Sequence, residues 1–355
     1  MKVWDNTAHS GVASALLAAL LFGASTPLAK LLLAQIPPLM LASLLYLGAG
    51  IGLLGGLLAG KLSRPAGPVA TLRTGDLPWL CGAILFGGML GPWLLLRGLA
   101  QTPASSAALL LNLESVFTAL FAYWLFGEHI GRRIAIGMAL IFAGGLMLSW
   151  QGTPQLGEAL APLAIVGACA CWALDNNLTR HIAAGDALLI AGSKGLVAGL
   201  VNLALAYTVG QSLPTPPLIL GAAVVGAIGY GASLGLFIVA LRHAGAARTG
   251  AYFSLAPFCG AALAVLLLHE TPTAAFWPAL LCMSIGLWLH LTERHAHQHS
   301  HEPLAHTHRH THDAHHQHAH DSPVAAAAAH THFHVHAPIC HSHPHYPDIH
   351  HRHRH

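Results

Sequence analysis

The sequence predicts an all-α integral membrane protein: ten transmembrane helices, arranged as two inverted five-helix repeats and followed by a disordered tail. Composition, ten long apolar stretches and an internal repeat support this prediction. Of the 355 residues, 54% are hydrophobic and only 8% are charged, whereas soluble domains carry about 25% charged residues. This composition excludes an ordinary soluble enzyme. The small net charge of +3 gives no indication of a nucleic-acid partner.

Ten stretches are each long enough to cross the bilayer, which takes about 20 apolar residues in a helix. Their short connections contain proline and glycine, so neighbouring helices should run antiparallel. The first stretch has a cleaved signal peptide as its alternative interpretation. Its uncharged run of residues 11–29 exceeds a signal core of about 7–15 residues, which favours a retained helix. The predicted spans are 11–33, 38–60, 77–98, 103–126, 133–150, 160–180, 187–208, 217–241, 246–268 and 274–292.

The basic residues predict the orientation, because Lys and Arg accumulate on the cytoplasmic side of membrane proteins. With a cytoplasmic N-terminus, only Lys30 and Arg97 fall on the outer side. We therefore expect both termini in the cytoplasm, with the chain in a bacterial inner membrane. Ten basic residues fall on the inner side: Lys2, Lys61, Arg64, Arg73, Arg132, Arg133, Arg180, Lys194, Arg242 and Arg248.

The two halves of the apolar region resemble each other. Residues 98–128 align with 240–270 at a shift of 142, and both segments end on a glutamate. Residues 22–30 align with 172–180, and both of these end on a basic residue. Each half has five spans, an odd number, so the repeats have opposite orientations. Inverted repeats are typical of secondary transporters, which bind substrate near the midplane between the halves.

These segments resemble the drug/metabolite transporter superfamily, in particular members with two EamA-type domains. The resemblance rests on Phe22 with Lys30, Trp172 with Arg180, the NLESVF and SLAPFC segments, and the two glutamates. It covers about residues 11–292. It implies an exporter of small organic metabolites, such as amino acids, in the lipid bilayer. The domains would be 1–150 and 151–294, two EamA-like repeats, and 295–355, a His-rich tail.

The chain departs from this family where a Glu-Pro pair is common. The fourth span keeps Glu114 but has Ser115, and the ninth has Ala256 but keeps Pro257. An asymmetric substrate site would require such divergence.

Polar residues inside the spans are the candidate substrate-binding residues, because charges at membrane depth are costly and usually functional. Glu114 lies near the middle of span four, two residues after Asn112, and Asp175 lies in span six. The alternatives are a protonated structural carboxyl for Glu114 and an interfacial role for Asp175. Three aromatic residues, which could instead be packing residues or interface anchors, complete the candidate set: Trp172, Trp93 and Tyr252.

Other intramembrane features have structural interpretations. We expect Lys30 and Arg97 to extend to the membrane interface, and the glutamates at 128 and 270 to cap helix hairpins. The glycines at 48, 52, 56 and 60 share one helix face, which favours close intramolecular packing, with a homodimer interface as the alternative. There is no P-loop or other catalytic motif, which argues against an enzyme and against ATP-driven transport.

The tail is a candidate metal-binding segment, because 23 of the 29 histidines lie between His295 and His355. Few large apolar residues accompany them, so disorder is expected. Imidazole binds zinc, nickel, cobalt and copper. The core requires no cofactor. A divalent-metal transporter is the alternative function, although the spans offer few metal ligands. The expected tail ligands are His306, His308, His310, His312, His330, His332, His334 and His336.

Overall fold

The computed structural model divides the chain into two compact units, Met1–Glu293 and Arg294–His355, which are described separately. In the first unit, the structure describes residues 2–62, 74–127, 130–149, 156–179, 182, 187–244 and 246–292. In the second unit, it describes residues 296–301, 304–310, 330–336 and 339–344.

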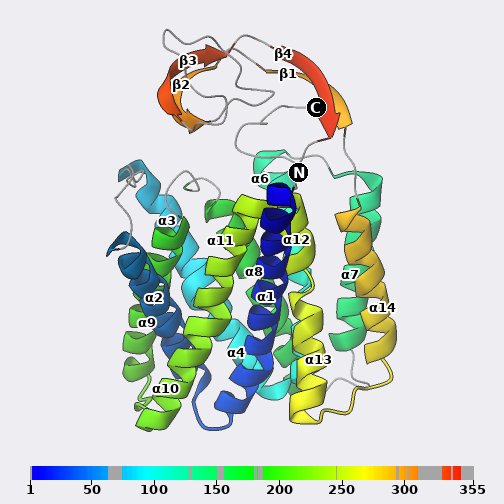
Figure 1. The fold of residues 1–355 in the computed structure, drawn as a ribbon. Helices are drawn as coiled ribbons and strands as arrows, with labels where there is room; N and C mark the ends of the chain where they lie inside the picture. The colour runs from blue at the N-terminus through cyan, green and yellow to red at the C-terminus, as the bar shows by residue number, and fades with distance from the viewer. Residues whose placement is uncertain are drawn as a thin grey trace. The chain divides into compact units, whose positions relative to one another are not determined.

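The first half of the helical unit contains five helical segments that correspond to predicted spans one to five (Figure 1). The third segment includes a π-helical stretch, and the fourth is broken at Leu111–Asn112. The elements are α1 (Lys2–Leu33), α2 (Pro38–Leu62), η1 (Thr74–Asp76), α3 (Leu77–Ala83), η2 (Ile84–Leu90), α4 (Gly91–Gln101), α5 (Ala104–Leu110), α6 (Leu113–Phe126) and α7 (Arg132–Ser149).

The second half repeats this order of elements within the residues that the structure describes. Its third segment again includes a π-helical stretch, and its fourth is broken at Ser254–Leu255. The elements are α8 (Leu156–Thr179), α9 (Ala187–Thr208), α10 (Pro216–Val225), η4 (Gly226–Ala232), α11 (Ser233–Ala244), α12 (Ala246–Phe253), α13 (Ala256–Leu268) and α14 (Phe276–Leu291).

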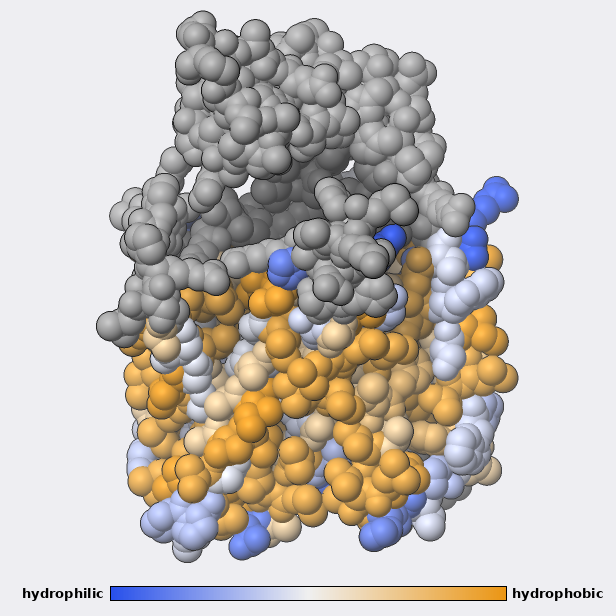
Figure 2. Space-filling model, in the orientation of Figure 1, coloured by the Kyte–Doolittle hydropathy of each residue, from blue (hydrophilic) through white to orange (hydrophobic). Residues whose placement is uncertain are grey.

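The fold class predicted from the sequence is therefore confirmed. Eight described segments are long and apolar enough to cross a membrane, and α14 is a shorter apolar helix. The sixth predicted span corresponds to α8, which is 24 residues long and carries Asp175, Asn176 and Asn177 near its end. Figure 2 shows that apolar side chains dominate the visible side of the helical unit, as expected of a surface in contact with lipid.

Local irregularities of the helical backbone recur at the 142-residue spacing between the two repeats. The π-helix η2 begins at Ile84, and η4 begins at Gly226, 142 positions later. Helices α6 and α13 end on left-handed residues, Gly127 with φ 67° and His269 with φ 51°, again 142 positions apart. Both π-helices contain glycine residues. π-Helical turns are rare and frequently lie at functional sites. The repeat therefore extends to backbone detail that hydropathy alone does not reveal.

Each half of the helical unit packs on the other half through equivalent helices. Helix α1 packs on α11 and α13 of the other half, and α8 packs correspondingly on α4 and α6. The remaining partners are the equivalent helices α2 with α9 and α7 with α14. The last pair lies side by side at one edge of the helical unit (Figure 1). The first helix of each repeat therefore contacts the third and fourth segments of the other, which brings the broken spans together.

The glycine face of α2 packs within the molecule. A Cβ atom at Gly48 would overlap the Ala223 carbonyl, and one at Gly52 would lie 3.2 Å from the Ala227 Cβ. A Cβ at Gly56 would meet nothing within 4 Å. The close-packing interpretation therefore holds at Gly48 and Gly52. Contacts within the molecule occupy both positions, so they give no support to a homodimer interface there.

In the tail, four described segments form two antiparallel two-stranded sheets, whereas the sequence predicts disorder. Strand β1 (Ala296–His301) pairs with β4 (Ile339–Pro344), and β2 (Leu304–His310) pairs with β3 (His330–His336). The alternating His-x-His sequence has the two-residue period of a strand. An isolated two-stranded ribbon is at best marginally stable in water, so this pairing does not provide the tail with a hydrophobic core.

Candidate functional site

A cavity of about 510 Å³ lies between the two repeats. Its volume is within the range of about 300–1,000 Å³ that is usual for small-molecule sites. Five helical segments line it. They are α1, the broken fourth span (its break and α6), α8, the broken ninth span (α12, its break and α13) and α14. The lining residues are Phe22, Leu111, Asn112, Glu114, Ser115, Thr118, Ala119, Ala122, Asn176, Asn177, Phe253, Ser254, Ala256, Pro257 and Leu287.

The breaks in the fourth and ninth spans form part of the cavity wall. The Asn112 side-chain amide donates to the Leu109 carbonyl at 3.0 Å, and the Ser115 hydroxyl donates to the Asn112 carbonyl at 2.7 Å. At the second break, the Ser254 hydroxyl donates to the Ala251 carbonyl at 2.7 Å. Such local bonds compete with the helical ladder, and they place polar side chains at both breaks inside the cavity.

Glu114 is positioned by a contact between the two halves. It is the second residue of α6, and its Oε1 accepts a 2.8 Å hydrogen bond from the Asn176 amide of α8. Neighbouring Asn177 donates to the Thr118 carbonyl at 3.3 Å and to the Ala173 carbonyl at 2.8 Å. The two asparagines thus join α8 to α6 along the cavity wall. The predicted site residues Glu114 and Asn112 both lie in this wall, and their function stays a prediction.

The structure places Asp175 outside the cavity lining described above, in an ion pair. Its Oδ1 contacts Lys194 Nζ of α9 and also accepts a 2.9 Å hydrogen bond from the Thr179 hydroxyl. The two charged side chains are only 12% and 15% exposed. From the sequence, Lys194 was identified only as an inner-side basic residue, and its pairing with Asp175 was not predicted. The available signal was two opposite charges inside successive spans, where unpaired charges are costly.

Trp172 contacts the π-helix η2. Its Nε1 donates to the Gly87 carbonyl at 3.0 Å, and the Tyr46 hydroxyl donates to the same oxygen at 2.8 Å. A Cβ at Gly87 would overlap the Asp175 carboxylate, so the glycine allows this close approach. Trp172 therefore stabilises the backbone beside the ion pair, and it does not belong to the described cavity lining.

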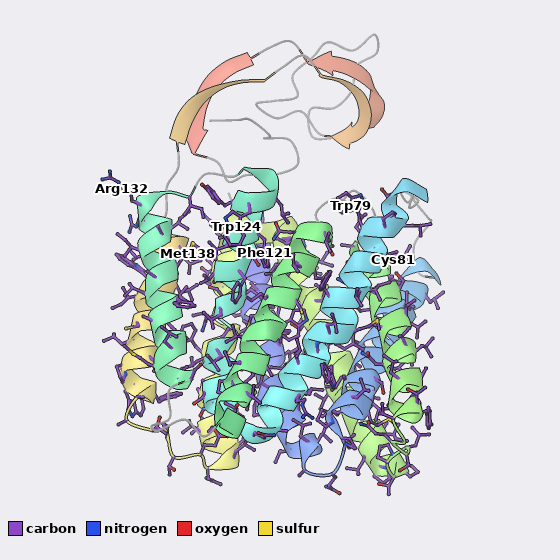
Figure 3. All side chains as sticks on the ribbon, turned by 180° about the vertical axis from the view of Figure 1, so that it is seen from behind. Trp79, Cys81, Phe121, Trp124, Arg132 and Met138 are labelled. Carbon is purple, nitrogen blue, oxygen red and sulfur yellow. The ribbon has the colours of Figure 1, made fainter. Side chains whose placement is uncertain are left out.

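The other candidate aromatic residues also lie outside the described cavity lining. Trp93 of α4 and Tyr252 of α12 are partly buried, and the cavity is lined instead by Phe22 and Phe253. Figure 3 labels Phe121 and Trp124 on α6, whose ring centroids are 6.3 Å apart. Trp124 is 67% exposed, which places it on the outer surface of the helical unit. In the sequence, Phe22 was distinguished only by its alignment with Trp172 in the repeat, and nothing there indicated that it lines the cavity.

Two charged residues at span ends cap helices of neighbouring segments. Glu270 accepts hydrogen bonds from the backbone N–H groups of Ala104 and Ser105, at 2.6 and 2.9 Å, and from the Ser105 hydroxyl at 2.6 Å. Lys30 donates to the carbonyls of Leu99, Ala100 and Thr102 at 2.6, 3.1 and 2.9 Å. The capping role predicted for Glu270 agrees with these bonds, and Glu128 lies outside the described residues.

The cap at Lys30 corrects the expectation that its side chain only extends to the membrane interface. Its three bonds satisfy carbonyls at the end of α4 that have no partner within the helix. Arg97, by contrast, is exposed.

Metal-ligating side chains do not gather in the described part of the chain: no group of three or more His, Cys, Asp or Glu residues was found there. The Cys169 thiol is buried and donates to the Leu110 carbonyl at 3.5 Å.

The inverted helical repeats and the cavity between them define a transporter-type integral membrane protein. Residues 9–150 and 159–292 each match the EamA-like transporter family. The two matches cover more than half of the chain, so the chain belongs to this family. The resemblance to two-domain EamA members of the drug/metabolite transporter superfamily is thereby confirmed.

Several relatives carry transporter names. An uncharacterized transporter of Methanothermobacter thermautotrophicus is 30% identical, over 73% of this chain and 80% of its own length. The uncharacterized inner membrane transporter YedA of Escherichia coli K12 is 26% identical, over 69% and 78%. A probable 4-amino-4-deoxy-L-arabinose-phosphoundecaprenol flippase subunit ArnE of Pseudomonas fluorescens is 40% identical, over 24% and 72%.

One solved structure, described only as the crystal structure of a protein, aligns with a TM-score of 0.55 at 20% identity. The alignment covers 78% of this chain and 95% of the other. At this identity, the likeness supports the fold alone.

Proposed function

We propose that the chain is a secondary transporter that exports small organic metabolites through the cavity between its repeats. The observation that carries this proposal is Glu114, an intramembrane carboxylate in the cavity wall that Asn176 of the other repeat holds at 2.8 Å. A site built from both repeats changes its access when the repeats move relative to each other. Because the sequence has no P-loop, an ion or substrate gradient drives the movement.

Proteoliposomes containing the purified protein test this function. An imposed proton gradient or substrate gradient should drive saturable flux of amino acids, amines or related metabolites, and protein-free liposomes should show none. Complete absence of gradient-driven flux across these compound classes would contradict the proposal.

We propose that both termini face the cytoplasm, and that the membrane is the bacterial inner membrane. Ten inner basic residues against two outer ones support this orientation. Reporter fusions after Arg64 and Arg133 should report the cytoplasm, and a fusion after Pro214 should report the opposite side. Activity of a periplasm-specific reporter after Arg64 and Arg133 would refute this orientation.

A second candidate function is metal handling by the tail. The β2–β3 register sets His306 opposite His334, His308 opposite His332, and His310 opposite His330. Imidazole binds zinc, nickel, cobalt and copper, so the number of histidines in this segment favours metal binding. Of the other predicted ligands, His336 pairs with Leu304, and His312 lies outside the described residues.

Deleting residues 295–355 should remove most zinc or nickel binding by the purified protein and leave membrane insertion intact. The reason is that 23 of the 29 histidines lie in the deleted segment. Equilibrium dialysis of the full chain and the truncated chain measures the bound metal. Loss of organic transport in the truncated chain would contradict a separable tail, and loss of metal tolerance alone would favour metal transport.

A further inference from the structure

The cavity wall contains one kind of charge. Among the described residues that line it, Glu114 is the only one with a charged side chain. The nearby acid, Asp175, already has Lys194 as its counter-ion. Lys194 is therefore engaged by the protein itself, and within the described structure the Glu114 carboxylate accepts a hydrogen bond only from the neutral amide of Asn176. An ionised carboxylate in a cavity without a cation favours a positively charged ligand.

The polar N–H groups of the wall are mostly occupied by the protein. The Asn112 amide donates to the Leu109 carbonyl and to Met283 Sδ, and the Asn177 amide donates to two backbone carbonyls. An amide group has two N–H donors, so both donors of each residue are engaged. The Asn176 amide has one donor on Glu114.

The hydroxyl groups follow the same pattern. The hydroxyls of Ser115 and Ser254 each donate to a backbone carbonyl, at 2.7 Å. The Thr118 hydroxyl is buried and has no hydrogen-bond partner in the described structure. A ligand therefore meets mainly acceptors: the second oxygen of Glu114, the Asn112 side-chain oxygen and the serine oxygens. The remaining donors, from Thr118 and Asn176, are neutral.

The other part of the wall is apolar and aromatic. The rings of Phe22 and Phe253 have centroids 5.5 Å apart, and both line the cavity. Leu111, Pro257 and Leu287 extend this surface. Aromatic faces attract cations as well as apolar groups, so the ring pair suits a ligand with an ammonium group attached to an apolar body.

We propose that this cavity binds a small organic cation: a protonated amine on an apolar body, without a carboxylate. The proposal rests on the transport function proposed for the same cavity, and it narrows the substrate class from small organic metabolites to amines. An α-amino acid would bring a carboxylate next to Glu114, where the described wall offers no cation to pair with it. Burying a charge without a partner is costly, so the wall discriminates against zwitterions and acids.

Three probes with the same phenylethyl body test this class: phenethylamine, phenylalanine and 3-phenylpropionate. Binding of each to the purified full-length protein in detergent is measured at neutral pH by equilibrium dialysis. We expect phenethylamine to bind about tenfold or more tightly than either other probe, since bonds to charged groups dominate such differences. Glu114→Gln should reduce phenethylamine affinity by a similar factor. Asp76→Asn, which removes a carboxylate outside the cavity, should leave it unchanged.

Three outcomes would overturn the amine proposal: equal or tighter binding of phenylalanine or 3-phenylpropionate, amine binding that survives Glu114→Gln, or no saturable amine binding. Flux in proteoliposomes separates this result from the transport function. Phenylalanine flux with tight phenylalanine binding would keep the transport function and reject the amine class. Selective amine binding without flux of any compound would keep the amine class and reject transport.

Discussion

Glu114→Gln should reduce transport by about tenfold to a hundredfold, because a hydrogen bond to a charged group contributes about 1.5–3 kcal/mol. Glutamine keeps the size of the side chain and can still accept the 2.8 Å bond from Asn176. It removes the negative charge and the titration. The variant should therefore fold and express normally while losing affinity for a cationic substrate.

The pH dependence of transport gives a second measurement on the same variant. For a cationic substrate, the ionised carboxylate is the binding form, so wild-type affinity should fall when acid protonates Glu114. The Gln variant should lack this component when transport is measured between about pH 4 and pH 8, an interval that covers both solvated and buried carboxyl groups. Asp76→Asn is the matched control. Unchanged transport by Glu114→Gln across this interval would make Glu114 a structural residue.

Lys194→Met should lower stability by about 3–5 kcal/mol, because it leaves Asp175 as a buried charge without its partner. This corresponds to a fall of about 5–15 °C in apparent melting temperature, measured on purified protein in detergent. The Thr179 hydroxyl alone, at 2.9 Å from Asp175, supplies no charge to replace the ammonium group. Arg97→Met, which removes an exposed cation from another span, should have little effect.

The double variant Asp175→Asn/Lys194→Met distinguishes the pair from simple loss of packing. Replacing both charges of a buried pair with neutral groups is often neutral or stabilising, so the double variant should recover most of the lost stability. A double variant as unstable as Lys194→Met would show that the charge of Asp175 is not the cause. Asp175→Asn should affect transport less than Glu114→Gln, because Asp175 lies outside the described cavity lining. Because Asp175 pairs with Lys194, Asp175→Asn alone should destabilise the protein by leaving Lys194 without its counter-ion.

The sequence alone determined the ten-helix architecture and its two repeats. The bilayer imposes this result, since each span needs about 20 apolar residues and few charges, and such a pattern is visible in one dimension. The resemblance of residues 98–128 to 240–270 likewise predicted the repeat, which the structure extends to the π-helices η2 and η4. Glu114 and Asn112 could also be identified from the sequence as candidate residues of the cavity, because polar residues in mid-span are rare.

The packing of the helices determines which of the intramembrane polar residues face the cavity and which face each other. Asp175 and Asn176 are neighbours in sequence, yet one pairs with Lys194 of α9 and the other binds Glu114 of α6. Successive residues on a helix point in directions about 100° apart. Their partners therefore depend on which helices pack beside α8, and in this fold those helices come from both repeats. That packing is encoded by side chains far apart in the chain, so no local pattern could reveal it.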